Sequence, residues 1–494
     1  MLPFAGLSSS VGAPEEGAFT PFPFVTVYDP PVTYDGTMKA TGAAIDLRAK
    51  PPFNAFDPRS QSWIDPMTGF EVFRITGDRY TPVLLRGNVD SGLLWPSAIK
   101  AQNAVQSYDA WNCDNTLLCL PEWKKLGDDG SYSNLVRTVM INTTGAPIGA
   151  VQAPSRPWQI VRASGSMGFE AGSSEWFWSP TDPLLAYLAR SDGWYEWFPV
   201  GDPARGMAVG QMRLYMAYPS GYSGWYNHGA PPSRTGNLYF TLAARENGSG
   251  LGHWGGIRFD LTNKTAGVFV RNPDQPNDDN DRGAGAMSPL GGYGHFSYQD
   301  HNGDGSYSTR DWIYFRWSDG RLLAKVNSFG HSCGADVDGA EYRAGNAGGG
   351  WQLENPVTGA RRMLLPVSTG AYHIGSSNLQ DTFEKYPQTP GGSLSGIRYL
   401  QCSMYGPGHV FGLRTGKNDL SKVRYIVNSR GTQAGRNSAE LHPHISNGAE
   451  YLVFNSNWCQ AVVTAENHVN NYVVIIPDAW KAKNNSGLSD DRDW

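Results

Sequence analysis

The sequence contains no run of roughly 18 or more apolar residues, so no membrane-spanning helix is predicted. A basic surplus is also missing, since 40 Lys and Arg stand against 45 Asp and Glu, and nucleic-acid binding would need a basic surface. The sequence has no Gly-rich phosphate loop before a helix, no HExxH and no G-x-S-x-G. The N-terminus lacks a basic start followed by an apolar stretch, so no signal peptide is predicted in the sequence as it stands.

Cysteine is scarce, with five residues: Cys113, Cys119, Cys333, Cys402 and Cys459. They are too few and too scattered for a disulfide framework or a CxxC metal site. Cys113 and Cys119 are close enough in sequence to pair across a local turn, and buried free thiols are the alternative. No amphipathic helix of useful length is present either, which leaves strands as the main predicted element.

Turn-forming and aromatic residues are abundant, with 59 Gly, 33 Pro, 17 Trp and 24 Tyr. From Trp63 onward a unit recurs in which a polar turn with Asp or Gly precedes two apolar runs. It is seen at 110–123, 177–202, 237–267, 311–326, 395–416 and 442–458. Short strands between frequent turns are typical of a sandwich, barrel or propeller, and a repeat of roughly 40–70 residues favours the propeller.

We therefore predict an all-β fold, a single β-propeller over residues 59–480 with six to eight blades, seven being favoured. Six units are clear, and a seventh fits between 206 and 236 or within 330–370. The segment 63–76, WIDPMTGFEVFRIT, resembles an outer strand without a blade of its own. We expect it to pair with the last blade, in 439–480, and so leave no free sheet edge.

The two ends of the chain differ from this pattern. Residues 1–58 are rich in Pro, Gly and Ser and predict an extended arm, and 481–494 predict a polar tail. The arm either docks on its own domain or packs on neighbouring copies of the chain.

The stretch 439–458, AELHPHISNGAEYLVFNSNW, predicts two short strands joined by a turn at Asn447-Gly448. Side chains alternate in direction along a strand, so His442 and His444 are expected on one face. Two imidazoles on one face indicate a metal ligand pair. The alternative is that both histidines cap a turn or make hydrogen bonds in the core.

The phrases AWNCDNTLL, WSPTDPLLAY, YHIGSSN and HPHISNGAEYLVFNSNW resemble blades of TolB-like or WD40-like bacterial β-propellers. Within that group they are similar to the oligogalacturonate-lyase type of polysaccharide lyase. The resemblance implies a divalent metal, typically Mn²⁺, held by His373 together with His442 and His444. Those lyases add a glutamine, whereas Ala439 stands at its position here, and Glu440 is the nearest substitute on the same strand face.

A lyase also needs a base, and histidine is the side chain most often used for proton transfer near neutral pH. The candidates are His295 in GGYGHFSYQD and His331 in FGHSCGAD, each preceded by glycine and expected to enter a blade from the axis side. An ordinary structural role is the alternative for either one.

The stretch 300–311, DHNGDGSYSTRD, matches a calcium loop, with a glycine at the sharp turn. The predicted oxygen ligands for Ca²⁺ are Asp300, Asn302, Asp304, Ser306 and Asp311. The alternative is a solvated hairpin turn, which these residues also favour.

Aromatic residues in or beside predicted turns are candidates for stacking on sugar rings: Trp194, Trp197, Tyr222 and Trp225. Together with the resemblance they predict an extracellular or secreted propeller that binds an acidic polysaccharide and cleaves it by β-elimination. Sequons at Asn142, Asn247, Asn263 and Asn484 fit exposed turns. The competing hypothesis is a non-catalytic structural or adhesive subunit of a filament, surface layer or virion, assembled through the arm.

Overall fold

The computed structural model describes strands, turns and one short helix distributed along the chain. The described residues are 52–54, 57–65, 69–77, 82–85, 88–94, 110–121, 125–126, 132–133, 138–142, 159–164, 176–183, 185–189, 194–199, 210–213, 222–226, 238–247, 250–260, 265–271, 285–288, 290–301, 307–319, 321–327, 332–337, 340–347, 350–365, 374–375, 391–393, 409–413, 423–428, 444–446, 450–456 and 470–477. Within these ranges, no helix is long and apolar enough to cross a membrane.

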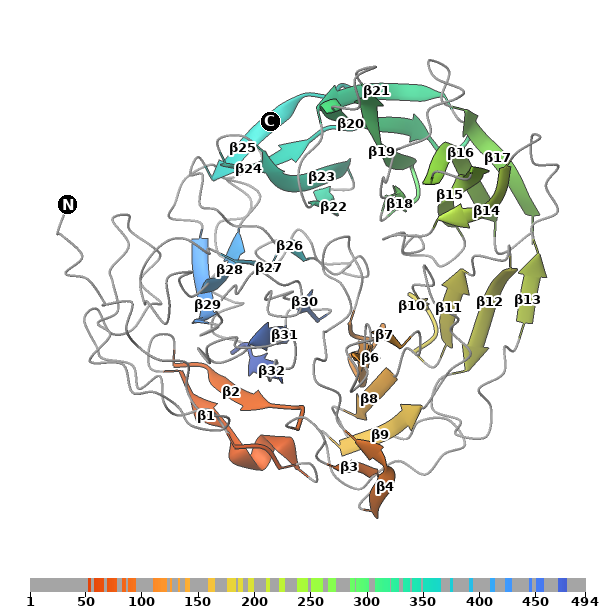
Figure 1. Cartoon of the computed structure of the whole chain (residues 1–494). Coiled ribbons are helices and arrows are strands. Elements are labelled where there is room, and N and C mark those ends of the chain that lie inside the picture. The colour runs from red at the N-terminus through yellow and green to blue at the C-terminus, as the bar shows by residue number, and fades with distance from the viewer. Residues whose placement is uncertain are drawn as a thin grey trace, which may run out of the picture.

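Five antiparallel sheets of four strands follow one another in chain order around a circle (Figure 1). In each of them the first strand lies nearest the centre and the last strand lies outermost (Figure 1). They are β10 (Trp176–Trp178), β11 (Leu185–Ala189), β12 (Trp194–Pro199), β13 (Gly210–Arg213); β14 (Tyr222–Tyr226), β15 (Leu238–Asn247), β16 (Gly250–Asp260), β17 (Thr265–Arg271); β18 (Gly285–Met287), β19 (Tyr293–His301), β20 (Tyr307–Arg316), β21 (Leu322–Asn327); β22 (Ser332–Val337), β23 (Ala340–Ala347), β24 (Gly350–Glu354), β25 (Arg361–Leu365); and β26 (Ile374–Gly375), β27 (Gly391–Ser393), β28 (His409–Leu413), β29 (Val423–Asn428).

The strands that precede β10 in the chain, from β3 to β9, form smaller sheets. They are β3 (Pro82–Leu85) with β4 (Asn88–Leu94); β5 (Leu117–Pro121), β8 (Thr138–Asn142) and β9 (Gln159–Ser164); and β6 (Lys125–Leu126) with β7 (Tyr132–Ser133). The all-β prediction is confirmed for the described residues. The number of blades stays a prediction.

The two ends of the described chain meet in one five-stranded sheet, which we call the closing sheet. Its order is β1 (Trp63–Ile64), β2 (Glu71–Arg74), β32 (Asn470–Ile475), β31 (Tyr451–Ser456), β30 (His444–Ile445). β2 pairs with β32 from Glu71 opposite Ile475 to Arg74 opposite Tyr472. The predicted pairing of 63–76 with the last blade is thus confirmed.

Apolar burial explains why these strands assemble. β32 has strands on both sides, and five of its six residues are buried, so its sequence NNYVVI needs no solvated face. Its apolar side chains join a core that also includes Val427 of β29, from the preceding sheet. Phe454 and Tyr472 stack there with ring centroids 5.5 Å apart. The closing sheet is therefore held to its neighbour as well as to itself.

A polar side chain closes the turn after the first strand in several sheets. In the closing sheet the Ser446 hydroxyl accepts hydrogen bonds from the backbone N–H groups of Glu450 and Tyr451, at 3.1 and 2.9 Å. The Ser288 hydroxyl accepts one from the N–H of Tyr293 at 3.0 Å. These local bonds satisfy buried backbone donors, which explains the recurring polar residue after each apolar run.

The first turns of neighbouring sheets also touch one another. The side-chain amide of Asn112 donates to the carbonyl of Pro183 at 3.0 Å, and that of Asn115 donates to the carboxylate of Glu450 at 3.4 Å. These contacts bring together the turn between Trp111 and β5, the β10–β11 turn and the β30–β31 turn at one end of the molecule. The strands that lead into the last two turns, β10 and β30, therefore begin at the opposite end.

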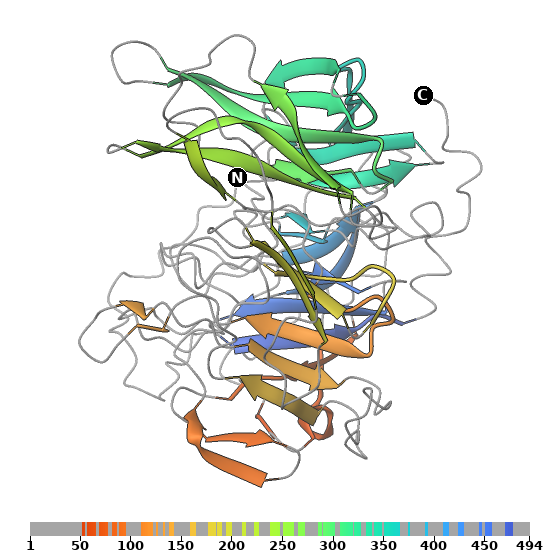
Figure 2. The same ribbon diagram turned by 90° about the vertical axis from the view of Figure 1, so that its right-hand side faces the viewer.

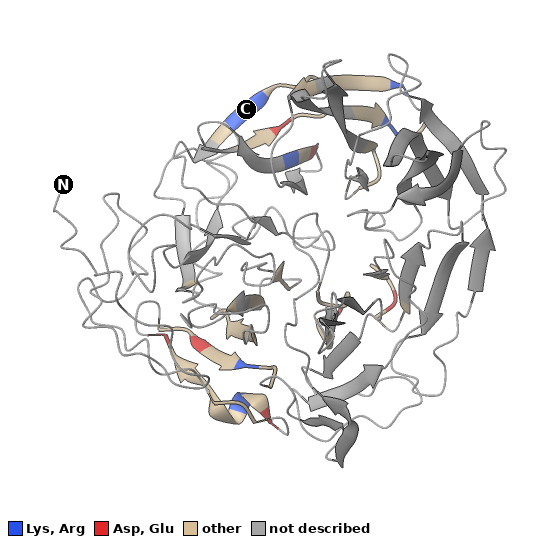
Figure 3. Ribbon diagram, viewed as in Figure 1, with Lys and Arg blue, Asp and Glu red and all other residues tan. Residues whose placement is uncertain are grey.

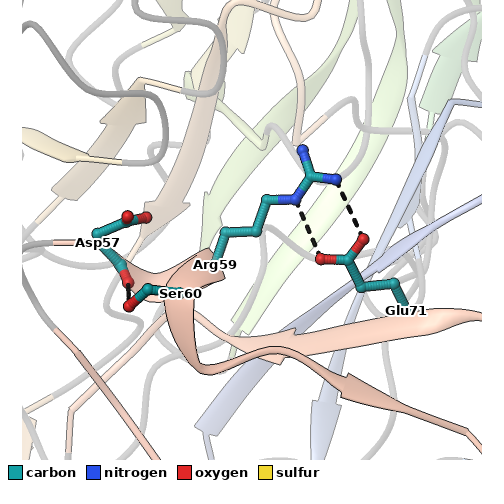
Figure 4. Close-up of polar contacts among 4 residues, drawn as sticks. All are labelled: Asp57, Arg59, Ser60 and Glu71. Atoms are coloured by element: carbon teal, nitrogen blue, oxygen red, sulfur yellow. Dashed lines mark hydrogen bonds and ion pairs between the residues drawn. The ribbon is translucent and has the colours of Figure 1, made fainter.

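The segment just before the closing sheet docks on it. The helix η1 (Pro58–Gln61) carries Arg59, whose Nε and Nη2 donate to the two carboxylate oxygens of Glu71 in β2 at 3.0 and 3.1 Å (Figure 4). The guanidinium of Arg74 lies 5.6 Å from the ring centroid of Phe53. Where the structure describes it, the end of the predicted arm packs on its own chain. The boundaries at residues 58 and 480 stay predictions, and the tail 481–494 lies outside the described residues.

Candidate functional site

His444 is the described member of the predicted metal ligand set. It lies in β30, opposite Val453 of β31, and only 1% of its surface is exposed. Its neighbour Ile445 packs in the apolar core shared with the preceding sheet. Because successive side chains of a strand alternate in direction, His444 lies on the other face of the closing sheet.

The remaining predicted ligands, His373, Glu440 and His442, lie outside the described residues. Among the residues that are described, no group of three or more His, Cys, Asp or Glu side chains could hold a metal ion. Of the predicted ligands, the described residues therefore include one, the buried imidazole of His444 in β30, the edge strand of the closing sheet. Imidazole and carboxylate together are donors suited to a divalent metal such as manganese.

The two candidate bases differ in their place in the fold. His295 is in β19, the second strand of its sheet, between Ala286 of β18 and Tyr314 of β20. His331 lies outside the described residues, immediately before β22, a first strand that begins at Ser332. In the sequence, His295 and His331 each follow a glycine and cannot be told apart. In the structure, His295 lies within a sheet, whereas His331 directly precedes the inner strand β22.

The predicted calcium loop stays a prediction, because three of its five ligands lie outside the described residues. Asp300 is the penultimate residue of β19 and Asp311 lies within β20, opposite Tyr298. An extended strand carries Asp311 away from the turn, because each residue advances the chain by roughly 3.3 Å. Asn302, Asp304 and Ser306 lie outside the described residues. β19 and β20 pair with each other on either side of residues 302–306.

The four aromatic candidates lie in strands of two sheets and not in turns. Trp194 and Trp197 are in β12, and Tyr222 and Trp225 are in β14. Trp194 is opposite Arg213 and Trp197 is opposite both Tyr187 and Gly210. Their sugar-binding role stays a prediction, and Trp194 and Tyr222, each first in its strand, are the ones that border a turn.

A buried polar cluster, which no sequence motif indicated, lies between the β18–β21 and β22–β25 sheets. The hydroxyl of Tyr314 donates to Oε1 of Glu354 at 2.5 Å, and both residues are fully buried. Arg361 donates to Oε2 of Glu354 at 2.6 Å. Arg343, at 1% exposure, lies near enough to influence the titration of both Tyr314 and Glu354. These four residues come from four strands, β20, β23, β24 and β25, so no local spacing predicts their meeting.

Burial dominates the electrostatics of this cluster. It raises the pKa of Glu354 although the bonds from Tyr314 and Arg361 act in the opposite direction. Burial, followed by the nearby Glu354 charge, raises the pKa of Tyr314 well above its usual value. Figure 3 shows basic and acidic residues together on the strands of the β22–β25 sheet. The bond between the fully buried Tyr314 and Glu354 joins the two sheets.

Comparison with known proteins identifies the class of fold. No protein-family model matches this chain, and no curated protein sequence matches it. Among solved structures, an oligogalacturonate lyase in complex with manganese matches with a TM-score of 0.50 and 12% identity, over 87% of this chain and 98% of that one. The fold is a β-propeller, and the resemblance noted in the sequence is confirmed at the level of the fold.

Two further solved structures match with lower TM-scores. An oligogalacturonate lyase from Vibrio parahaemolyticus has a TM-score of 0.46 and 10% identity, over 87% of this chain and all of that one (100%). The β-propeller domain of Cps50 (Swd1) from Myceliophteria thermophila has a TM-score of 0.41 and 8% identity, over 77% of this chain and 99% of that one.

Proposed function

We propose that this protein is a β-propeller lyase that binds an acidic polysaccharide and cleaves it by metal-assisted β-elimination. The similarity in fold to an oligogalacturonate lyase in complex with manganese, over nearly the whole of that chain, supports the reaction class. Fold alone does not determine activity, so the proposal depends on the positions of histidines in this sequence.

The observation that carries the proposal is that histidines lie at the start of the innermost strands, β22, β26 and β30, of three consecutive sheets. His331 directly precedes β22, His373 directly precedes β26, and His442 stands two residues before β30, which itself begins with His444. First strands lie nearest the centre of the circle (Figure 1), and β22 and β26 are in contact. A residue next to a strand end is at most about 3.8 Å from it along the chain. This arrangement supports one shared site for the histidines.

The first turns of the β18–β21 and β22–β25 sheets are in contact. Glu341, just past the first turn of the β22–β25 sheet, accepts hydrogen bonds from the backbone N–H groups of Leu290 and Gly292 at 2.5 and 3.0 Å. Leu290 and Gly292 belong to the first turn of the preceding sheet, so both first turns lie at one end. The starts of β18 and β22 therefore share the opposite end, as those of the closing sheet and its neighbours do.

We assign His373, His442, His444 and Glu440 to the metal. A divalent metal held there would neutralise the uronate carboxylate and so make the neighbouring C5–H bond more acidic. Neutral His331 then takes the C5 proton, the C5–H electron pair forms the C4=C5 double bond, and the C4–O bond breaks. The leaving oxygen takes a proton from water or from an acid of the site. We prefer His331 to His295 because His295 lies within a sheet, between two paired strands.

The test is to incubate the protein with polygalacturonate and with an ulvan-type polyuronate, each with manganese supplied. Ultraviolet absorbance follows the unsaturated products. We expect products from the wild type and a loss of about 100-fold or more in rate for His331→Ala, the usual range for a lost general base. The same measurement on His295→Ala decides between the two histidines, since the larger loss identifies the base. No unsaturated product from any polyuronate, with manganese or calcium present, would refute the lyase proposal.

A further inference from the structure

Side-chain hydrogen bonds join the β18–β21 sheet to the β22–β25 sheet, and Figure 1 and Figure 2 both show the two sheets side by side. The hydroxyl of Tyr314 donates to Oε1 of Glu354 at 2.5 Å, and that of Tyr293 donates to the carbonyl of Tyr342 at 3.0 Å. The rings of Tyr293 and Tyr314 meet edge to face, with their centroids 5.6 Å apart. We call these two hydrogen bonds, with the residues that form them, the sheet joint.

A third contact crosses between the same two sheets at their first turns. The carboxylate of Glu341 accepts hydrogen bonds from the backbone N–H groups of Leu290 and Gly292 at 2.5 and 3.0 Å. A Cβ added at Gly292 would lie 2.3 Å from Oε2 of Glu341, so the two turns are in close contact. These N–H groups stay bonded only while the two sheets are together, and their hydrogen exchange therefore reports on the sheet joint.

Glu354 is the residue of the sheet joint whose charge changes between acid and neutral pH. Its side chain is fully buried. The charged and titratable groups around it, among the described residues, are Arg361 and Arg343 of its own sheet and Tyr314, backed by Tyr293, of the neighbouring sheet. An ionised carboxylate that leaves water is stable only as far as its partners replace the lost hydration. Despite both arginines, burial raises the pKa of Glu354.

Opening of the sheet joint would return the Glu354 carboxyl to water, where its pKa is near the ordinary value of 4.5. The closed joint therefore holds the proton of Glu354 more tightly than the open joint does. By linkage, a rise in pH above 4.5 favours the open joint, until Glu354 is ionised in the closed joint as well. The hydrogen bond from Tyr314 is the contact that connects this titration to the neighbouring sheet.

We propose that the sheet joint is a pH-sensitive switch, closed in acid, whose local opening becomes more frequent as the buried carboxyl of Glu354 ionises. The switch lies beside the inner strand of the β22–β25 sheet, because Arg343 is opposite Gly334 of β22. Opening therefore changes the contacts of that strand's sheet with its neighbour while the antiparallel pairing within each sheet is kept. This inference goes beyond the proposed function and does not depend on it.

The test is amide hydrogen exchange of the full chain, measured from about pH 4.5 to about pH 8 on the wild type, Glu354→Gln and Tyr293→Phe. Each rate is divided by the intrinsic rate at that pH, since unprotected amides themselves exchange faster as pH rises. The readout is the protection of the N–H groups of Leu290 and Gly292. The reference is the N–H of Asn471 in the closing sheet, which donates to Oγ1 of the buried Thr76 at 2.9 Å and involves no ionisable side chain.

In the wild type we expect the protection of Leu290 and Gly292 to fall severalfold relative to Asn471 as pH rises. Glu354→Gln should abolish this fall, because an amide does not titrate. Tyr293→Phe, the matched control, should lower protection by a constant factor of about 2 to 10 at every pH, the effect of one lost neutral hydrogen bond.

A wild-type protection of Leu290 and Gly292 that does not change with pH relative to Asn471 would overturn the switch. An equal fall in the wild type and in the Glu354→Gln protein would overturn it too, since the carboxylate of Glu341 is common to both proteins and would then be the group that titrates.

Discussion

At the scale of single residues, Glu354 shows how strongly the interface between two propeller sheets depends on polar pairing. Its carboxylate is fully buried and receives bonds from Tyr314 and Arg361. A buried charge that loses its partner is costly, so all three side chains are needed together. Tyr314, Glu354 and Arg361 lie in three different strands, and no sequence pattern indicates that they are in contact.

The raised pKa of Glu354 predicts a pH dependence of stability. Above the unfolded value near 4.5 the folded state holds its proton longer than the unfolded state does. The free energy of unfolding therefore falls as pH rises through the window above that value. Glu354→Gln removes the titrating group, so urea unfolding measured across this window should show a smaller decrease than in the wild type. Identical pH dependence of the free energy of unfolding in the two proteins would contradict the assignment of this effect to the raised pKa of Glu354.

The histidines, in contrast to Glu354, could be singled out from the sequence. Their spacing in sequence and the period of a strand were enough to single out His442 and His444, and β30 places His444 on a buried inner strand. The choice between His295 and His331 needed the topology, because it depends on which strand of a sheet each one adjoins.

At the scale of elements, turn chemistry made the sheets predictable. A polar residue after an apolar run, as at Ser288 and Ser446, closes the first turn by a side-chain bond to the backbone, and such short-range bonds are legible in sequence. At 300–311 the sequence left two alternatives open, because the same Asp, Asn and Gly residues favour a calcium loop and a hairpin alike.

The strand pairing in the closing sheet leads to a prediction for the thermal unfolding of two truncated proteins. Removing residues 1–51 retains Phe53, Arg59 and β2, so cooperative thermal unfolding should persist with a midpoint within a few degrees of the full chain. Removing residues 1–77 deletes β1 and β2 and leaves one edge of β32 unpaired, with loss of the buried Phe70 and Val72. Circular dichroism on the two truncated proteins checks this.

The control for this pair is Arg59→Ala. Its ion pair with Glu71 is partly exposed, and such pairs contribute about 0.2–1 kcal/mol, so this substitution alone should scarcely move the midpoint. Unchanged unfolding after removal of residues 1–77 would show that the terminal strands do not hold the sheet together.

At the scale of the whole molecule, the fold could be predicted from the sequence because a unit of one polar turn and two apolar runs recurs along the chain. Recurring turns and apolar runs predicted a propeller, and the predicted pairing of 63–76 with the last blade is present as β2 beside β32. The segment 330–370, named as room for another unit, holds the complete β22–β25 sheet. Contacts between sheets, such as that of Glu354, escaped prediction because they join residues with no fixed spacing.

The central claim is that histidines at the starts of inner strands form one metal site at one end of the propeller. Anomalous diffraction at the manganese absorption edge, from crystals grown with manganese, tests it most directly. We expect a peak bounded by His373, His442 and His444 that is lost in crystals of His444→Ala. A wild-type crystal with no peak among these three histidines would contradict it.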